Sequence, residues 1–177
     1  MVQLLDDILT INRAETGKLE FNPKPLNLIR FCRKFVEEMQ LSAGANHTLL
    51  FDYQRSQVNA CLDKKLLRSI LANLLSNAIK YSPQGGEVRI SLTFNHNNAR
   101  IQICDRGIGI PTEDRQQLFE PFHRGKNVRR IPGTGLGLVV VKKCIDMHGG
   151  SIVLASQTNK GTTVTVTLPL IQVEKEE

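Results

Sequence analysis

Two asparagines stand four residues apart in a leucine-rich segment, at Asn73 and Asn77. On a helix, these two and Lys80 fall within one narrow arc beside the leucine face, with Tyr81 at its margin. A carboxamide oxygen suits Mg²⁺, which keeps several waters and often completes its coordination with substrate phosphates. Asparagine gains nothing from an ordinary helix interior. The spacing therefore favours a metal and phosphate site over two solvated helix residues.

An acidic residue, Asp105, directly follows an apolar run and is followed by Gly107 and Gly109. A carboxylate there can accept a hydrogen bond from an exocyclic amine such as that of adenine, and glycines let the backbone pass close to a ring. The alternative is an aspartate in an ordinary turn. The segment is not a convincing dinucleotide-binding fingerprint, because a third glycine is missing and Pro111 follows at once.

A second glycine-rich segment covers 133–137 and precedes an apolar helix. It lacks the Gly-Lys-Ser/Thr of a P-loop, but its amides and the helix N-terminus suit an anion. Between the two glycine segments lies a basic loop flanked by helix breakers, with Arg124, Lys126, Arg129 and Arg130. Such a loop beside a phosphate site suits a nucleotide better than DNA, although Arg129 and Arg130 also fit a solvated loop.

Hydrophobic periodicity places these motifs on alternating helices and short strands. Helices are expected over 1–17, 26–41, 64–80 with Asp63 as N-cap, and 136–147. Strands are expected over 19–26 at a sheet edge, 47–53, 58–62, 88–94, 100–104, 151–155 and 162–168. Several neighbouring strands are joined by hairpins, so the pattern favours an α/β (α+β) fold with a mixed sheet covered by helices on one face.

Composition indicates a soluble globular domain with one sizeable core. The chain has 177 residues, 41% of them hydrophobic and 23% charged. It contains no apolar run near the ~20 residues that cross a bilayer and no signal peptide, which predicts a cytoplasmic location. The net charge of +6 is spread along the chain, so no nucleic-acid partner is expected.

Three groups of residues are expected to be structural. Buried thiols, rather than disulfides or a zinc site, are predicted at Cys32, Cys61, Cys104 and Cys144. Packing anchors of the loop are predicted at Phe119 and Phe122. Ordinary surface or capping histidines, rather than catalysts, are predicted at His123 and His148.

Together the motifs resemble the catalytic ATP-binding domain of a two-component sensor histidine kinase, within the gyrase, heat-shock chaperone, histidine kinase and mismatch-repair ATPase superfamily. Segment 73–81 resembles its N box and 105–109 its first glycine box. Segment 118–124 resembles its F box and 133–137 its second glycine box. The resemblance covers about 19–170 and implies a two-layer sandwich of a mixed, largely antiparallel sheet with helices on one face, and a flexible ATP lid over roughly 110–132.

The resemblance also implies ATP and Mg²⁺ as cofactors and gives the site residues their roles. Metal coordination falls to Asn77 with help from Asn73, and the catalytic residues are Asn73, Lys80 and Arg124. Asp105 reads adenine, and Thr162 is similar to a threonine that assists it. The expected ATP-binding residues are Asn77, Tyr81, Asp105, Gly107, Gly109, Lys126, Gly133, Thr134, Gly135, Leu136, Gly137 and Thr162.

No histidine of this chain occupies the place of the family's phosphoacceptor. Segment 1–18 resembles the end of the dimerisation and phosphoacceptor hairpin, although it also fits an amphipathic helix lying on its own domain. The expected division is therefore 1–18 for the hairpin end, 19–171 for the catalytic domain and 172–177 for a charged tail. The implied partners are the dimerisation and histidine phosphotransfer domain, a response regulator receiver domain and a second copy in a full-length homodimer, with membrane anchoring of the parent left open.

The expected activity is transfer of the ATP γ-phosphoryl group to a histidine outside this chain, for onward transfer to a response regulator aspartate. One alternative is a hydrolytic ATPase of the same superfamily, but those enzymes usually carry a glutamate where Asn73 stands, and an amide cannot serve as that base. The other alternative is a non-enzymatic docking module that retains the fold, and the intact motifs argue against it.

Overall fold

The structure, a computed structural model, describes residues 2–54, 58–128 and 130–170. Arg129, Met1 and the expected charged tail at 172–177 lie outside the described residues. The helices are α1 (Val2–Glu15), α2 (Leu28–Ala43), α3 (Lys64–Lys80) and α4 (Gly137–Met147), with short 3-10 helices η1 (Thr112–Gln117) and η2 (Lys126–Val128). The strands are β1 (Lys24–Asn27), β2 (His47–Tyr53), β3 (Asn59–Leu62), β4 (Gly86–Phe94), β5 (Asn98–Asp105), β6 (Ser151–Gln157) and β7 (Gly161–Pro169).

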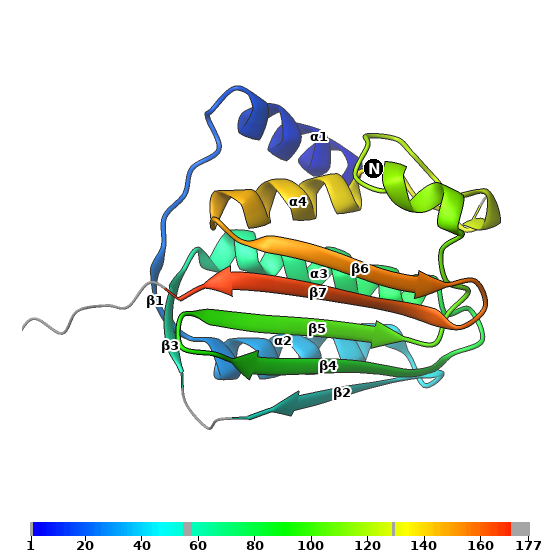
Figure 1. The fold of residues 1–177 in the computed structure, drawn as a ribbon, viewed down its shortest axis with the longest axis horizontal. Coiled ribbons are helices and arrows are strands. Elements are labelled where there is room, and N and C mark those ends of the chain that lie inside the picture. The colour runs from blue at the N-terminus through cyan, green and yellow to red at the C-terminus, as the bar shows by residue number, and fades with distance from the viewer. Residues whose placement is uncertain (1, 55–57, 129, 171–177) are drawn as a thin grey trace, which may run out of the picture.

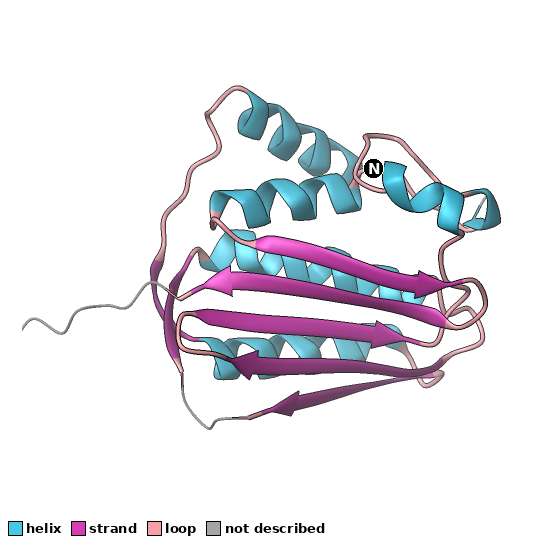
Figure 2. Ribbon diagram, in the orientation of Figure 1, coloured by secondary structure: helices cyan, strands magenta, loops and turns pink. Residues whose placement is uncertain are grey.

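A five-stranded sheet in the order β2-β4-β5-β7-β6 forms one layer, and helices form the other (Figures 1 and 2). The β2–β4 pair is parallel and the remaining pairs are antiparallel. Helix α2 packs on β2, α3 on β5 and α4 on β6, all against the same face. The expected two-layer fold with a mixed, largely antiparallel sheet is confirmed.

The expected edge strand over 19–26 is wrong in extent. Only Lys24–Asn27 forms a strand, and it pairs with β3 in a separate two-stranded sheet. The preceding backbone is held differently, because the Asn22 N–H donates to Asp63 Oδ2 at 2.8 Å. The other oxygen of Asp63 caps α3 as expected, accepting from the Lys65 and Leu66 amides at 2.9 and 3.0 Å.

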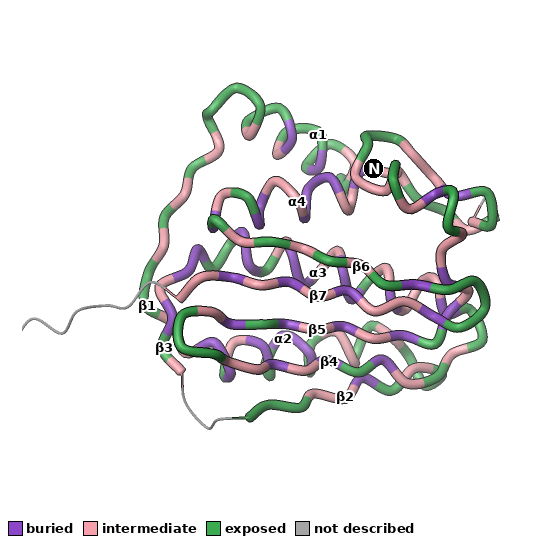
Figure 3. The backbone as a smooth tube through the Cα atoms, viewed as in Figure 1, coloured by how far each residue is buried: buried purple, intermediate pink, exposed green. Residues whose placement is uncertain are grey.

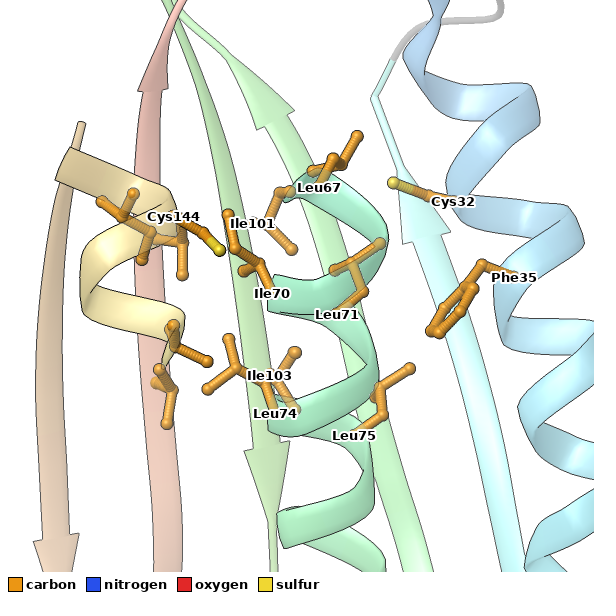
Figure 4. Close-up of a cluster of buried hydrophobic side chains, with 14 of the residues drawn as sticks. Cys32, Phe35, Leu67, Ile70, Leu71, Leu74, Leu75, Ile101, Ile103 and Cys144 are labelled. Atoms are coloured by element: carbon orange, nitrogen blue, oxygen red, sulfur yellow. The ribbon is translucent and has the colours of Figure 1, made fainter. Parts of the chain in front are cut away.

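The core lies between α3 and the sheet (Figure 4). Ile70 and Leu74 of α3 lie beside Ile101 and Ile103 of β5, while Leu71 is on the side of α3 toward Phe35 of α2, and all of these side chains are buried. Cys32 and Cys144 are also in the core, and burial raises their pKa values to about 12 and about 11, so both are inert thiols. The expectation of buried thiols is wrong for Cys61 and Cys104, which are free and half-buried because they face away from the helices.

His148 is buried, so of the two expected roles, surface or capping, the structure supports capping. It follows the last residue of α4, and its Nδ1 lies 2.8 Å from the Cys144 carbonyl. The Asp63 N–H donates to its Nε2 at 3.1 Å. These bonds require the neutral tautomer with its proton on Nδ1. The ring therefore acts as a cap that joins the end of α4 to the start of α3.

Helix α1 lies on α4 and presents two apolar stripes. Its inner side contributes Leu4 and Ile11 to the core cluster. Its outer side leaves Val2, Leu5 and Leu9 exposed at 77%, 59% and 42%. Figure 3 shows exposed backbone along much of α1. The inner stripe suits a helix lying on its own domain, and the outer stripe suits a helix of a larger bundle. Within the described residues, no helix combines the length and apolarity needed to cross a bilayer.

Replacing Leu71, which is 1% exposed, should show how far stability depends on the layer between α3 and the sheet. We expect Leu71→Ala to lower the free energy of unfolding by about 2–5 kcal/mol, because it removes buried methyl groups and leaves a cavity. Urea denaturation measures this loss. The matched control is Leu41→Ala on α2, where the side chain is 88% exposed, and a change within about 0.5 kcal/mol is expected. Equal losses in both variants would contradict this account of the core.

Candidate functional site

A cavity of about 300 Å³ opens between α3, the start of α4, the ends of β5 and β7, and the segment 110–132. Its apolar part is contributed by Leu74, Ile103, Leu154 and Val164. Its polar part comes from the α3 asparagines, Asp105 and the basic loop. A volume of this size, mostly apolar with a few convergent polar groups, is typical of a small-molecule site.

Helix α3 gives the cavity an amide-lined wall. Asn73 donates from Nδ2 to the Ser69 carbonyl at 2.9 Å, which fixes the orientation of its amide. Its Oδ1 then points at the start of α4, since a Cβ placed on Gly137 would lie 2.9 Å from that oxygen. Asn77 lines the cavity one turn further on. Two amide oxygens can thus reach one side of a bound ligand, as a hard cation requires.

Lys80 and Tyr81 close the same wall at the end of α3. The Lys80 ammonium lies 4.7 Å from the centroid of the Tyr81 ring. A Cβ placed on Gly133 would lie 3.1 Å from Lys80 Nζ. The glycine therefore lets the loop that precedes α4 approach the ammonium closely. This brings a positive charge beside a run of backbone amides.

Asp105, at the end of β5, is only 8% exposed. Its Oδ1 accepts from the Gly107 amide at 2.8 Å and from the Thr162 amide at 3.2 Å. Burial raises the pKa of this carboxyl above its usual range, and the two amide bonds oppose that shift. Among the described residues, Oδ2 accepts no hydrogen bond, so it is the oxygen that a ligand in the cavity can use.

Glycine is required at two turns that shape the cavity. Gly109 has φ +65°, and a Cβ there would lie 1.9 Å from the Gln157 carbonyl oxygen. Gly135 has φ +73°, and a Cβ there would lie 2.8 Å from the carbonyl carbon of Phe122. Any side chain at either position would push the 110–132 segment or the second glycine motif away from the cavity.

Segment 110–132 folds back over the cavity, and hydrogen bonds of its described residues hold it there. Asn127 Nδ2 donates to the Gly109 carbonyl at 2.9 Å, and the Phe122 amide donates to the Gly135 carbonyl at 3.1 Å. The Arg124 guanidinium donates to the Val128 carbonyl at 2.9 Å and also to that of Ile131. In this arrangement Arg124 both lines the cavity and holds its own loop together.

Two expectations for this segment need correction or refinement. Phe122 is wrong as a packing anchor, because it is 66% exposed with φ 64°, whereas Phe119 is half-buried. The left-handed backbone turns the Phe122 side chain outward while its amide binds Gly135. His123 is half-buried rather than on the surface, and its Nε2 lies 3.8 Å from Oδ1 of the buried Asp114.

The structure brings most of the expected site residues to one cavity. Those that line it are Asn73, Asn77, Lys80, Tyr81, Asp105, Gly109, Arg124, Gly133, Thr134, Gly135, Gly137 and Thr162. Three others lie outside the lining. Gly107 packs against the Tyr81 carbonyl, Leu136 is buried in the core, and Lys126 is exposed with its amide donating to Asp114 Oδ2 at 3.1 Å.

Helix α1 contributes two cavity residues that the sequence did not predict, Gln3 and Asp7. Asp7 is 4% exposed and accepts from Gln3 Nε2 at 2.8 Å. Burial raises the pKa of Asp7, the Gln3 bond opposes that shift, and the charge of Asp6 adds to it. Figure 1 shows the N-terminal end of α1 beside the loop over the cavity. The sequence signal for this pair is that Gln3 and Asp7 are polar residues four positions apart in a helix rich in apolar residues.

Comparison with known proteins places this geometry in a family. The model of the histidine kinase-, DNA gyrase B-, and HSP90-like ATPase family matches residues 62–172. The chain is 30% identical to the sensor histidine kinase WalK of Bacillus subtilis, covering all of this chain and 30% of that protein. It is 36% identical to the circadian input-output histidine kinase CikA of Synechococcus elongatus, covering 96% of this chain and 23% of that protein.

A solved structure agrees with these sequence relatives. The histidine kinase AdeS of Acinetobacter baumannii superposes with a TM-score of 0.78 at 27% identity, covering 97% of this chain and 79% of that one. The chain spans less than a third of the length of both curated relatives. The chain belongs to the histidine kinase-, DNA gyrase B-, and HSP90-like ATPase family, and within it to the catalytic ATP-binding domains of sensor histidine kinases.

Proposed function

We propose that this chain binds ATP with Mg²⁺ and transfers the γ-phosphoryl group to a histidine on a dimerisation domain outside the chain. The observation that carries the proposal is one cavity lined by a buried carboxylate, by the amides of Asn73 and Asn77, of which the Asn73 amide has a fixed orientation, and by cationic side chains. A purine triphosphate has matching chemistry, because its base carries hydrogen-bond donors and its phosphates need a cation.

The carboxylate end fits adenine. Asp105 Oδ1 is occupied by two backbone amides, so Oδ2 is the acceptor for the exocyclic amine of the base. Thr162 lines the cavity next to it, and Ile103 and Val164 give an apolar surface for the ring. Guanine carries a carbonyl oxygen at the corresponding position, and two facing acceptors repel. The site is therefore expected to select adenine.

The amide and cationic side chains of the cavity fit a magnesium-bound triphosphate. Asn73 and Asn77 supply amide oxygens to the metal, which when bound offsets the negative charge of the phosphates. Lys80 and Arg124 add positive charge, and the loop from Gly133 leads its amides into the start of α4. Because Gly109 and the other glycines of the site have no side chain, backbone N–H groups can come close to the phosphates. Lys126 would reach the phosphates only if segment 110–132 changes its position.

Transfer is favoured over hydrolysis by the chemistry of Asn73. Its Nδ2 is committed to the Ser69 carbonyl, and an amide cannot take a proton from water. In-line transfer needs mainly positioning and charge neutralisation, which this site can supply. The acceptor histidine would come from the dimerisation domain, with residues 1–18 as the end of its hairpin. The full-length protein would then act as a homodimer and pass the phosphoryl group to a response regulator aspartate.

Replacing Asn77 tests the metal end of the site. We expect Asn77→Ala to weaken binding of a non-hydrolysable ATP analogue by about tenfold or more in magnesium, because one amide ligand is lost. Without magnesium the variant and the wild type should bind alike. Isothermal titration calorimetry under both conditions measures the difference. Asn12→Ala on α1 is the control, since Asn12 is exposed and does not line the cavity. A magnesium dependence that survives in Asn77→Ala would exclude Asn77 as a ligand.

Asp105→Asn tests whether the Asp105 carboxylate recognises adenine. The variant keeps an Oδ1 acceptor for the Gly107 and Thr162 amides. We expect it to remove the preference for adenine, because an amide NH₂ replaces the free carboxylate oxygen. Competition between ATP and GTP analogues measures the preference. A strong adenine preference in the variant would contradict the assignment.

The same variant carries a prediction about pH. The folded-state pKa of Asp105 lies above the ordinary aspartate value of 3.8, so the native state binds the proton more tightly than the unfolded state does. Wild-type stability should therefore fall as pH rises from about 3.8 through the raised pKa, and this loss should be absent in Asp105→Asn. Thermal melts of the ligand-free chain between pH 3 and 7 measure it. Parallel profiles for the two proteins would show that Asp105 is not desolvated.

Asp7→Asn tests the unexpected carboxylate from α1. The asparagine keeps the acceptor for Gln3 but removes a negative charge that would repel phosphates. We expect the ATP analogue to bind about threefold more tightly at pH 7 and low salt, with a smaller gain at high salt. Asp6→Asn, on the same helix but exposed, is the matched control and should have little effect. An unchanged affinity in Asp7→Asn would show that α1 does not influence the bound phosphates.

A further inference from the structure

A row of three polar side chains crosses the sheet at the carboxylate end of the cavity. Asp105 of β5 is paired with Thr162 of β7, and Thr162 is paired with Ser156 of β6. Ser156 is 7% exposed and does not itself line the cavity, whereas Asp105 and Thr162 do. Ser156 therefore lies next to Thr162, on the side of Thr162 away from Asp105 and outside the cavity lining. Its neighbours along β6, Ala155 and Gln157, are exposed.

The Ser156 hydroxyl has all of its hydrogen-bonding capacity occupied. The Ile110 amide donates to its Oγ at 2.8 Å. Its own hydrogen is donated to the Gly161 carbonyl at 2.9 Å. The Thr162 hydroxyl lies 2.8 Å from the same Oγ. With the single Ser156 hydrogen assigned to the Gly161 carbonyl, which can only accept, the Thr162 hydroxyl donates its hydrogen to Ser156.

This assignment decides what Thr162 can offer to a ligand. Its hydroxyl hydrogen points at Ser156, so only oxygen lone pairs remain for the cavity. Asp105 likewise presents Oδ2, an acceptor. Two acceptors side by side match the amine of adenine and oppose the carbonyl oxygen of guanine. A threonine free to rotate could instead donate to that carbonyl.

We infer that Ser156 is a positioning residue for nucleotide specificity, because it fixes the Thr162 hydroxyl as an acceptor toward the base. The inference rests on the proposed ATP site and deepens it. Ser156 also holds the start of the segment over the cavity, through the Ile110 amide and through its own carbonyl, which accepts from Arg115. Ser156 thus both fixes the Thr162 hydroxyl and attaches the start of segment 110–132 to β6.

The test compares the binding of non-hydrolysable ATP and GTP analogues to the 177-residue chain and its variants by calorimetry. We expect Ser156→Ala to lower the ratio of the two affinities about tenfold, mainly by tightening the GTP analogue, because the freed Thr162 hydroxyl can turn and donate. Ser156→Cys, which keeps the side-chain size with a poor hydrogen-bonding group, should act in the same direction and decides the matter if the alanine variant does not fold. Ser151→Ala, on the exposed end of β6, is the control.

A double-mutant cycle shows whether Ser156 acts through Thr162. In a Thr162→Val background, Ser156→Ala should leave the affinity ratio unchanged, because no hydroxyl remains to turn. Equal weakening of both analogues with an unchanged ratio in Ser156→Ala and Ser156→Cys would reduce Ser156 to a structural role and overturn the inference. Failure of the wild-type chain to bind either analogue would instead overturn the proposed function on which the inference rests.

Discussion

Burial of the Asp105 carboxylate is the constraint around which the rest of the site is arranged. A carboxylate at the end of a core strand is costly unless its oxygens find donors, and the Gly107 and Thr162 amides supply them to one oxygen only. The other oxygen is left for a ligand. The same amides fix the turn after β5 and the position of β7. Because β5 packs on α3, the depth of this carboxylate also sets its relation to the asparagines across the cavity.

Helix α3, across the cavity from Asp105, contributes side chains both to the hydrophobic core and to the cavity wall. Its leucine and isoleucine side chains form the centre of the core, which fixes the helix against the sheet. Its amide stripe lies at the border of that core and needs no movement to face the cavity. The Asp63 cap and the buried His148 ring tie the start of α3 to the end of α4. The amide-lined wall and the glycine loop before α4 are thus positioned by the same pair of packed helices.

Much of this arrangement was predictable because it follows from local patterns. Periodicity gave α3 and its Asp63 cap, and short motifs gave the asparagines, Asp105 and both glycine segments. Contacts distant in sequence were not predictable. His148 is buried because its ring bonds Asp63 across 85 residues, and Phe122 is exposed because a left-handed turn reverses it. Asp7 has only its spacing from Gln3 as a local signal and Ser156 has none, so their places beside and behind the cavity follow from the packing of α1 and the register of β6.

The central claim is that one cavity reads adenine and holds magnesium-bound phosphates. The most direct measurement is calorimetric titration of the wild-type chain with a non-hydrolysable ATP analogue, with and without magnesium, alongside the matching GTP analogue. We expect binding that strengthens with magnesium and favours adenine. Absence of binding, or binding that ignores both the metal and the base, would contradict it.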